Sequence, residues 1–479
     1  MPLLIGDAIR DAARATPQAT AATLGADQIS FAALDEQANR AANALRGLGV
    51  RRGDVLAWWS GAALHNLTGM LACARIGAVF APLSPQLGPG EARPVLDYLD
   101  PRLLVCDDER LEPGSGVRAV GVDGLDSLIR SASPAAPVTP DLTEDDPHIL
   151  YLTSGSTGTP KGVLVSHRAS WLRSAPGPAD PPMRGMLSSF PLFHYGGWHY
   201  VLEAWLNRTA VHLVPKADAA HLIDAIQRHR PTAMYAIPAV WERVLAEPAD
   251  LSSLRNADTG TSLVAEELLE RLAARIPRAR TRILYGASEA GRMTSLAHHE
   301  LAGHPGSVGT PFGAGQIRIA EDGEVLFRGP TLMNGYLRLA DQPVHDGWYR
   351  TGDLGRLDER GFLYLTGRKR EVIRSGGETI SPAEVETAIR GLPGVRDVAV
   401  VGLPDSTWGE VVCAAIVPED GQPMPTVASL RAQLPGLASY KHPRVIAAAA
   451  EIPRTSATGQ VVRAKVRANV LAEQAASHA

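Results

Sequence analysis

The part of the sequence best suited to chemistry is the run YLTSGSTGTPKGVLVSH at residues 151–167. Between residues 153 and 162 it contains only small hydroxyl residues, glycines, one proline and Lys161, and apolar residues flank it on both sides. Glycine lets backbone N–H groups approach an anion closely, while hydroxyl groups and an ammonium donate to phosphate oxygens. This composition predicts a loop that binds the phosphate chain of a nucleoside triphosphate.

Two other interpretations of the loop are weaker. The Walker-type loop requires Gly, four residues, then Gly-Lys-Ser/Thr, whereas here Gly155 is followed by Pro160-Lys161-Gly162. That spacing disfavours a switch GTPase or a motor ATPase. A flexible Ser/Gly linker is also disfavoured, because linkers rarely separate two strand-like apolar runs such as residues 149–152 and 163–165.

The run resembles the phosphate loop of the adenylate-forming (AMP-binding) superfamily, which includes acyl-CoA synthetases, adenylation domains of peptide synthetases and luciferases. The resemblance extends over nearly the whole chain, with further elements in the same order. It implies catalytic roles for Thr153 and Lys161. The nucleotide-binding residues that it implies in this loop are Thr153, Ser154, Gly155, Ser156, Thr157 and Gly158.

A second element, Tyr-Gly-Ala-Ser-Glu at residues 285–289, follows a strand-like run. A hydroxyl beside a carboxylate at the end of a strand can serve a phosphate and its Mg²⁺, although a turn with a surface glutamate is an equally good interpretation of these residues alone. The element is similar to the family's Tyr-Gly-x-Thr-Glu. The resemblance implies nucleotide contacts from Tyr285, Gly286 and Ser288, and catalytic and metal-binding roles for Glu289.

A third element places Asp353 directly after a Thr-Gly pair, where we expect a turn. A carboxylate can accept hydrogen bonds from both ribose hydroxyls, but alone it is more simply a turn residue. In register with the family, Asp353 looks like the ribose ligand, with Arg368 beside it.

Residues 191–197, Pro-Leu-Phe-His-Tyr-Gly-Gly, resemble the family's Pro-Leu-Phe-His element, and an aromatic run continues beyond an expected break at the two glycines. A lone histidine is more often structural. The resemblance implies that this stretch borders the acyl pocket and the tunnel for the thiol, with a catalytic role for His194. The acyl-pocket residues that we expect are Tyr195, Gly196, Trp198, His199, Tyr235, Gly260 and Thr261.

Gly376 and Gly377 open another conspicuous run, Gly-Gly-Glu-Thr-Ile-Ser-Pro-Ala-Glu-Val-Glu. Adjacent glycines allow close backbone approach to a narrow ligand. The resemblance implies that Gly376, Gly377 and Lys441 line the channel for coenzyme A. An ordinary helix start is compatible with that role, with Ser381 as N-cap and Glu384 completing a capping box.

The chain departs from the family at Gln460, within Ile-Pro-Arg-Thr-Ser-Ala-Thr-Gly-Gln-Val-Val-Arg. The family has a catalytic lysine here, which bridges the substrate carboxylate and the α-phosphate while the adenylate forms, and its charge offsets two meeting anions. Glutamine brings no charge, and losing one such group typically costs about 10²–10³ in rate. Lys465 is not expected to reach the same place. We expect weakened adenylation and a less affected thioester-forming step.

Three functions remain open. The first is an acyl- or aryl-CoA ligase, an acid–thiol ligase that forms a CoA thioester from a small carboxylic acid through an acyl-adenylate. The second is a ligase that only converts a supplied acyl-AMP, for which an upstream adenylating enzyme would be the partner. The third, a non-catalytic acyl-adenylate or nucleotide-binding protein, is disfavoured by the intact phosphate, metal and ribose elements. The implied cofactors are ATP or AMP, Mg²⁺ and coenzyme A. Free CoA is favoured over a carrier-protein arm because residues 437–443 resemble those of CoA ligases.

Composition narrows the class of protein. At 479 residues, two or three domains are expected. The net charge of −4 offers no basic field for nucleic acid. Three widely spaced cysteines suit a reducing compartment and form no zinc spacing. With no secretory leader and no apolar run long enough to span a bilayer, we expect a cytoplasmic protein.

These residues must be positioned by an α/β fold. A helix at residues 33–48, a strand at 54–59, a helix at 66–76 and a strand at 78–83 begin an alternation that predicts layered, largely parallel sheets. A small β-rich subdomain is expected at 307–336, and a small α+β domain follows with helices at 382–392 and 426–434 and strands at 395–403 and 411–417.

We place the domain boundary at Arg370, with an AMP-binding and acyl-binding domain at residues 1–369 and a C-terminal domain at 370–479. In the family the C-terminal domain is mobile and rotates between the half-reactions. Arg370 stands at the family's pivot position, where Asp or Lys is common.

Overall fold

The computed structural model describes residues 2–110, 116–153, 161–175, 183–262, 264–340, 342–375, 378–455 and 459–478. The chain divides into two compact units. Unit 1 comprises Met1–Gln316 and Phe327–Tyr349, and unit 2 comprises Ile317–Leu326 and Arg350–Ala479. Arg370 lies in unit 2, in a turn that follows a strand. The domain boundary and the hinge at Arg370 therefore stay predictions.

One sheet of unit 1 has seven strands among the described residues, in the order β18-β8-β7-β4-β3-β5-β6. Its central strands pair in parallel, and β8 and β18 are antiparallel additions at one edge. The strands are β3 (Val55–Trp59), β4 (Val79–Pro82), β5 (Leu103–Cys106), β6 (Ala119–Gly121), β7 (Pro147–Thr153), β8 (Lys161–Ser166) and β18 (Gly335–Tyr336). The helices along this part of the chain are α1 (Ile5–Ala15), α2 (Phe31–Gly47), α3 (Leu64–Ile76), α4 (Pro89–Leu99) and α5 (Val122–Ser131). The predicted alternation of helices and strands is confirmed here.

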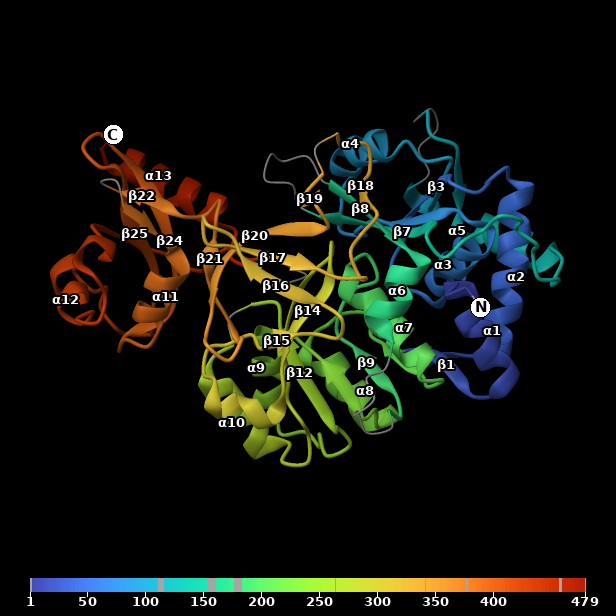
Figure 1. The fold of residues 1–479 in the computed structure, drawn as a ribbon, viewed down its shortest axis with the longest axis horizontal. Helices are drawn as coiled ribbons and strands as arrows, with labels where there is room; N and C mark the ends of the chain where they lie inside the picture. Colours follow the sequence, from blue (N-terminus) through green and yellow to red (C-terminus); the bar gives the residue numbers. More distant parts are fainter. Residues whose placement is uncertain are drawn as a thin grey trace. The chain divides into compact units, whose positions relative to one another are not determined.

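The second sheet of unit 1 runs in the order β15-β14-β13-β12-β11-β9-β10-β1-β2. Its strands are β1 (Thr20–Leu24), β2 (Asp27–Ser30), β9 (Met186–Ser188), β10 (Val211–Leu213), β11 (Ala233–Tyr235), β12 (Asn256–Gly260), β13 (Ile283–Ala287), β14 (Gly291–Leu296) and β15 (Thr310–Pro311). The helices of this region are α6 (His167–Ser174), α7 (Tyr195–Leu206), α8 (Ala219–His229), α9 (Pro238–Ala246) and α10 (Glu266–Arg275) (Figure 1). At the start of several helices, a side chain accepts a hydrogen bond from a backbone N–H of the first turn. In α6, for example, Ser166 Oγ accepts the Ala169 N–H at 3.1 Å.

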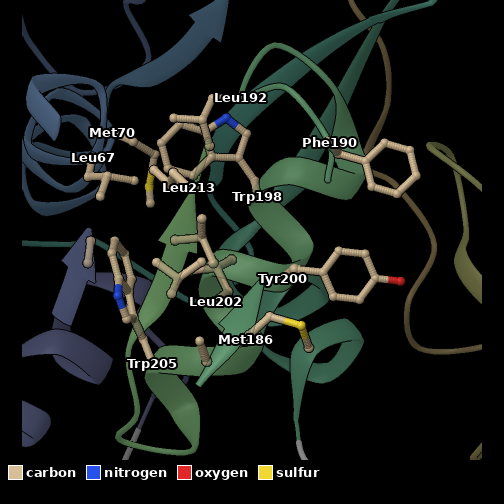
Figure 2. Packing of buried hydrophobic residues seen from close by; sticks show 14 of the residues in the cluster. Leu67, Met70, Met186, Phe190, Leu192, Trp198, Tyr200, Leu202, Trp205 and Leu213 are labelled. Atoms are coloured by element: carbon tan, nitrogen blue, oxygen red, sulfur yellow. The ribbon is translucent and has the colours of Figure 1, made fainter. Parts of the chain in front are cut away.

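The largest hydrophobic core of unit 1 is built around α7. Figure 2 shows Trp198 and Trp205 of this helix packed with Met70 of α3 and with strand residues of the second sheet. Each fully buried large apolar side chain contributes roughly 1.5–3 kcal/mol relative to leaving it exposed. Trp205 keeps its indole N–H satisfied by donating to the Ala21 carbonyl at 3.0 Å. This packing fixes α7, which carries several of the predicted acyl-site residues.

The β-rich part of the chain forms a sheet in the order β16-β17-β20-β19, with β21 on β20. Its strands are β16 (Gln316–Ile319), β17 (Glu324–Arg328), β19 (Val344–His345), β20 (Trp348–Leu357) and β21 (Leu363–Arg368). The predicted β-rich segment is present, but its bounds differ from those expected at 307–336. The strands continue to Arg368, while β15 and β18 join the two larger sheets.

The C-terminal part of unit 2 is a sheet in the order β23-β22-β25-β24, with β26 beside β25. Its elements are β22 (Ile373–Ser375), β23 (Glu378–Ile380), α11 (Pro382–Arg390), β24 (Val395–Asp405), β25 (Gly409–Pro418), α12 (Val427–Ala432), β26 (Val445–Ala448) and α13 (Arg463–His478). Alternate residues of β24 pack in two cores, one with α11 and α12 and the other with α13. The predicted α+β pattern is confirmed.

None of the helices in the described ranges combines the length and the apolar character that a bilayer span requires. Cys73, Cys106 and Cys413 are buried thiols.

Candidate active site

The base of the phosphate loop is a β-hairpin in unit 1. Thr153, at the end of β7, is the register partner of Lys161, at the start of β8. The Thr153 hydroxyl donates to the Lys161 carbonyl at 3.4 Å. Ser154, Gly155, Ser156, Thr157 and Gly158 lie outside the described residues, so their contacts with a nucleotide stay predictions.

Glu289 and Lys161 are brought together by Tyr336. This tyrosine lies on β18, the strand that pairs with β8. Its hydroxyl donates to Glu289 Oε1 at 2.7 Å, and Lys161 Nζ lies 4.9 Å from the centroid of its ring. Glu289 is buried, with 9% of its surface exposed. Sequence reasoning missed Tyr336, because no local spacing marks it and its place depends on the pairing of β18 with β8.

A buried arginine holds the turn that carries Glu289. Arg173, near the end of α6, donates to the carbonyls of Ser288 (3.0 Å), Glu289 (3.1 Å) and Thr331 (2.8 Å). Burial lowers the pKa of its guanidinium. The Arg173 side chain, which sequence reasoning also missed, therefore fixes the backbone of the Ser288–Glu289 turn. Tyr285 and Gly286 lie within β13 itself, because this strand continues to Ala287.

The Glu289 carboxylate fits Mg²⁺ as a single protein ligand. In the described part of the chain, no three His, Cys, Asp or Glu side chains are grouped closely enough to hold a metal by themselves. Mg²⁺ commonly binds through one or two carboxylates together with substrate phosphates. A single carboxylate such as that of Glu289, oriented by Tyr336, matches that mode.

Stacked aromatic rings occupy the predicted acyl region. The Phe190 ring stacks on His194 with centroids 5.2 Å apart and on Tyr235 at 5.5 Å, and Tyr200 stacks on Tyr235 at 5.3 Å. Trp198 lies in the hydrophobic core, edge-on to Phe80 at 5.5 Å, which favours packing over the predicted acyl contact. We call the stacked rings of Phe190, His194, Tyr200 and Tyr235 the aromatic wall. They come from α7, β11 and the segment between β9 and α7.

His194 caps the start of α7. Its Nδ1 accepts the Gly196 N–H at 3.1 Å, and burial lowers its pKa to about 4, so the ring is neutral near neutral pH. The expected break at the two glycines is wrong, since both lie inside α7. A Cβ on Gly197 would lie 2.4 Å from the Pro191 carbonyl oxygen, so close packing explains the glycine. The catalytic role of His194 stays a prediction.

Polar groups gather at one side of the aromatic wall. His199 Nδ1 lies 3.2 Å from Ser174 Oγ, and its Nε2 lies 3.6 Å from Glu203 Oε2 and 3.5 Å from Arg292 Nη2. Burial, with a smaller contribution from Arg292, holds the pKa of His199 well below its ordinary value. Tyr195 stacks on the same ring with centroids 5.5 Å apart. Sequence reasoning found Tyr195 and His199 but not the charged residues beside them.

Tyr235, Gly260 and Thr261 lie together, as the predicted acyl pocket requires. The hydroxyls of Tyr235 and Thr261 are 2.8 Å apart. Gly260 has a φ of 149°, and a Cβ there would lie 2.0 Å from the Leu284 carbonyl oxygen. Only glycine fits this close approach of β12 to β13.

The predicted ribose ligand lies in unit 2. Asp353 and Arg368 are register partners on β20 and β21, and their side chains form an ion pair at 3.2 Å. The Asp353 N–H also donates to the Thr351 hydroxyl at 3.0 Å. The expected turn is wrong, because residues 351–353 lie within β20 and only Gly352 adopts a positive φ, of 75°.

Gln460 is joined to Thr455 by two hydrogen bonds in unit 2. The Thr455 N–H donates to the Gln460 carbonyl at 2.8 Å, and the Gln460 N–H donates to the Thr455 hydroxyl at 3.1 Å. Arg454 donates to the Gly459 carbonyl at 3.1 Å and binds both carboxylate oxygens of Asp397 at 2.9 Å. The backbone position of residue 460 is therefore fixed by its neighbours.

The predicted CoA-channel residues are only partly described. Gly376 and Gly377 lie outside the described residues. Lys441 pairs with Glu384 at 2.6 Å, which raises the pKa of the lysine. The expected capping box is wrong: Ser381 is the N-cap of α11 but its hydroxyl donates to the Thr366 carbonyl, and Glu384 binds Lys441 instead.

Two parts of the chain match known protein families. Residues 9–337 match the model of the AMP-binding enzyme family, and residues 384–458 match that of the AMP-binding enzyme C-terminal domain. The first match alone spans more than half of the chain, so the chain belongs to the AMP-binding enzyme family. Within it, the chain belongs to the acyl-CoA synthetase branch of adenylate-forming enzymes, which bind ATP or AMP and make CoA thioesters of carboxylic acids through acyl-adenylates.

Several relatives define that branch. The chain is 34% identical to an indoleacetate–CoA ligase of Aromatoleum aromaticum, over 94% of this chain and 95% of that protein. It is 32% identical to a feruloyl-CoA synthase of an Amycolatopsis species, over 95% of this chain and 96% of that protein. Among solved structures, ATP-bound MatB from Rhodopseudomonas palustris matches with a TM-score of 0.86 and 26% identity, covering 98% of this chain and 99% of that one. The o-succinylbenzoate CoA synthetase MenE from Bacillus subtilis, with its acyl-adenylate intermediate, gives the same score and identity, covering 98% of each chain.

Proposed function

We propose that this protein is an acyl- or aryl-CoA ligase whose adenylation half-reaction is weak because Gln460 replaces the family's lysine. In the first half-reaction, a carboxylate oxygen attacks the α-phosphorus of ATP and pyrophosphate leaves. In the second, the CoA thiol attacks the acyl carbonyl, loses its proton, and AMP leaves. Mixed-anhydride activation divides one difficult acyl transfer into two easier steps.

The observation that carries the proposal is the chemistry of residue 460. Two anions must meet in the first half-reaction, and a cation there lowers the barrier far more than a neutral amide does. Hydrogen bonds from Thr455 and the Arg454–Asp397 pair fix the backbone around the glutamine. Lys465 is exposed in the first turn of α13, which supports the view that it does not substitute for the missing charge.

The remaining site residues receive roles that support both half-reactions. Lys161 and the loop from Thr153 would neutralise the phosphate oxygens, and Glu289, held by Tyr336, would bind Mg²⁺. When bound, Mg²⁺ neutralises charge on the phosphates. The ribose would be bound by the Asp353 carboxylate, whose orientation the pair with Arg368 maintains.

The acid that fits best is small and cyclic or aromatic. The stacked rings of Phe190, Tyr200 and Tyr235 support this choice, because aromatic faces bind flat apolar groups well. Relatives named for indoleacetate and feruloyl substrates support it as well. Gly376, Gly377, Lys441 and His194 would border the path of CoA, and Arg370 would act as the hinge between half-reactions.

A second candidate also follows from Gln460. If adenylation is lost rather than weakened, the enzyme acts only on a supplied acyl-AMP, and an upstream adenylating enzyme is its partner. The third candidate is a non-catalytic protein that binds nucleotides or acyl-adenylates.

Two assays distinguish these candidates. ATP–pyrophosphate exchange is measured with a panel of small aromatic acids, and thioester formation is measured from CoA and synthetic acyl-AMP. We expect slow exchange and ready thioester formation, and we expect Gln460→Lys to raise exchange by about 10². Gln422→Lys, at an exposed glutamine of the same unit, is the matched control and should leave exchange unchanged.

The outcomes separate clearly. Exchange by the natural chain at the rate of its Gln460→Lys variant would refute the weak-adenylation proposal. Thioester from acyl-AMP but none from ATP would establish the second candidate. Tight acyl-AMP binding with no thioester from either source would establish the non-catalytic protein.

A further inference from the structure

Arg292 lies at the polar side of the aromatic wall and was not among the predicted acyl-pocket residues. It is on β14, three residues after Glu289. Its guanidinium carbon lies 4.5 Å from the centroid of the Phe312 ring, and its Nη2 lies 3.5 Å from His199 Nε2. The guanidinium is thus held between an aromatic face and an imidazole.

The charge of Arg292 is not matched by a direct ion pair. Within the described ranges, no Asp or Glu oxygen lies close enough to Arg292 to form a salt bridge, whereas Arg282 of the same sheet pairs with Asp258 at 2.6 Å. The buried Glu203 carboxylate approaches the same His199 nitrogen as Arg292, at 3.6 Å, and is the acidic group nearest to that contact in the described structure. A partly buried cation is costly unless an anion pairs with it.

The electric field of Arg292 reaches the aromatic residues of the predicted acyl pocket. Burial raises the pKa values of Tyr195 and Tyr235, and the positive charge of Arg292 offsets part of that rise. Burial lowers the pKa of His199, and Arg292 lowers it further. The cation therefore acts on the rings that would surround the body of the acid. A ligand lying against these rings would lie within the field of Arg292.

We propose that Arg292 binds a second carboxylate on the substrate, remote from the reacting one, so that the enzyme selects dicarboxylic acids with an aromatic or cyclic body. This inference rests on the proposed function and specifies its substrate class. A guanidinium suits the task because its donors match a carboxylate as a planar fork. A monocarboxylic acid would leave the cation desolvated without an anion, and sites built for a polar partner strongly reject analogues that lack it.

The test uses two acids of the same skeleton, benzoate and isophthalate. Thioester formation is measured from CoA and the synthetic adenylate of each acid, so that weak adenylation does not mask selectivity. We expect kcat/KM of the natural chain to favour the isophthaloyl adenylate by about 10², chiefly through KM. Arg292→Leu should remove or reverse this preference, and Arg292→Lys should retain part of it.

A matched control is Arg278→Leu, which removes one exposed positive charge from unit 1. It should keep the natural preference. Stabilisation of the protein by each adenylate in thermal unfolding gives a second readout, in which only the dicarboxylic compound should lose effect in Arg292→Leu.

Each outcome is decisive. Equal use of both adenylates, or a preference for the benzoyl adenylate by the natural chain, overturns this inference and leaves the proposed function intact. A preference for the isophthaloyl adenylate that survives Arg292→Leu overturns the role of Arg292. If Arg292→Leu does not fold, the natural preference and the Arg292→Lys ratio decide. No thioester from any acyl-AMP refutes the proposed function instead.

Discussion

Tyr336 donates a hydrogen bond of 2.7 Å to Glu289, and its ring faces the ammonium of Lys161 at 4.9 Å. The three residues come from β18, the turn after β13 and the start of β8. One tyrosine thus connects the base of the predicted phosphate loop with the predicted metal carboxylate. Its position depends on a two-residue strand that pairs with β8 at the edge of a sheet.

Tyr336→Phe should weaken binding of MgATP while keeping the ring that Lys161 faces. The substitution leaves a buried carboxylate oxygen without its donor, which costs about 1–3 kcal/mol and allows Glu289 to turn away. We expect the Kd for MgATP, measured by calorimetry, to rise about tenfold. Tyr364→Phe in unit 2 serves as the control. An unchanged Kd for MgATP in Tyr336→Phe would show that Tyr336 does not position the carboxylate.

Acid should destabilise unit 1 through two buried histidines. His167 Nδ1 accepts the Ile5 N–H at 3.2 Å, and His148 stacks on the same ring at 4.8 Å. Burial lowers the pKa of His167 from 6.5 to about 4, and that of His148 well below its ordinary value. The unfolded chain then binds more protons, so stability present above about pH 6.5 is lost as the pH falls towards 4, by about 3 kcal/mol for His167.

The measurement is the free energy of unfolding in urea across that pH range. His167→Asn should flatten the dependence on pH, while His345→Asn, at an exposed position, should keep the natural slope. A natural chain with constant stability between about pH 6.5 and 4 would contradict the prediction.

Arg463 should be essential for the stability of unit 2. Its Nε binds Glu371 at 2.7 Å, and its guanidinium also binds Glu386, which is only 5% exposed. Arg463→Met would leave the buried Glu386 carboxylate without its cation, which should lower the free energy of unfolding by about 3–5 kcal/mol.

The control for this prediction lies on the same helix. Arg467 contacts Glu410 at 3.4 Å on the surface, so Arg467→Met should cost less than about 1 kcal/mol. Hydrogen exchange of α13 and β24 in the full chain checks both variants. Similar exchange in the two would mean that the Arg463–Glu386 pair adds no more than a surface contact.

Two glycines in helices of unit 1 should respond oppositely to alanine. In Gly197→Ala, the new Cβ would meet the Pro191 carbonyl at 2.4 Å, so we expect a loss of about 1–3 kcal/mol and a displaced 191–194 segment. In Gly90→Ala no atom lies within 4 Å of the new Cβ, so the change should be neutral or stabilising by up to about 1 kcal/mol. Thermal unfolding of both variants checks this difference, and equal melting temperatures would contradict it.

Much of the fold could be predicted because its signals are local. Apolar runs at 395–403 and 411–417 predicted the strands β24 and β25, and a helical stripe predicted α2, each within a few residues of the observed bounds. Local signals misled where tertiary pairing decides the backbone. Thr351 and Gly352 have turn composition but lie within β20, and the hydroxyl of Ser381, the N-cap residue of α11, binds the Thr366 carbonyl instead of a helix N–H.

The candidate site divides in the same way. Thr153, Lys161, Glu289 and Asp353 stand in compact motifs, so composition and family register indicated them. Tyr336, Arg173 and Arg292 are isolated in the sequence and reach the site only through the pairing of β18, the course of α6 and the direction of β14. No local spacing encodes such contacts.

The clamp formed by Arg454 and Asp397 has an evolutionary consequence. This pair and the hydroxyl of Thr455 hold the backbone next to residue 460, through contacts that use only the backbone N–H of that residue. A glutamine codon becomes a lysine codon through a single nucleotide exchange. Under the proposed function, a lineage could therefore strengthen or weaken ATP-driven activation in one mutational event.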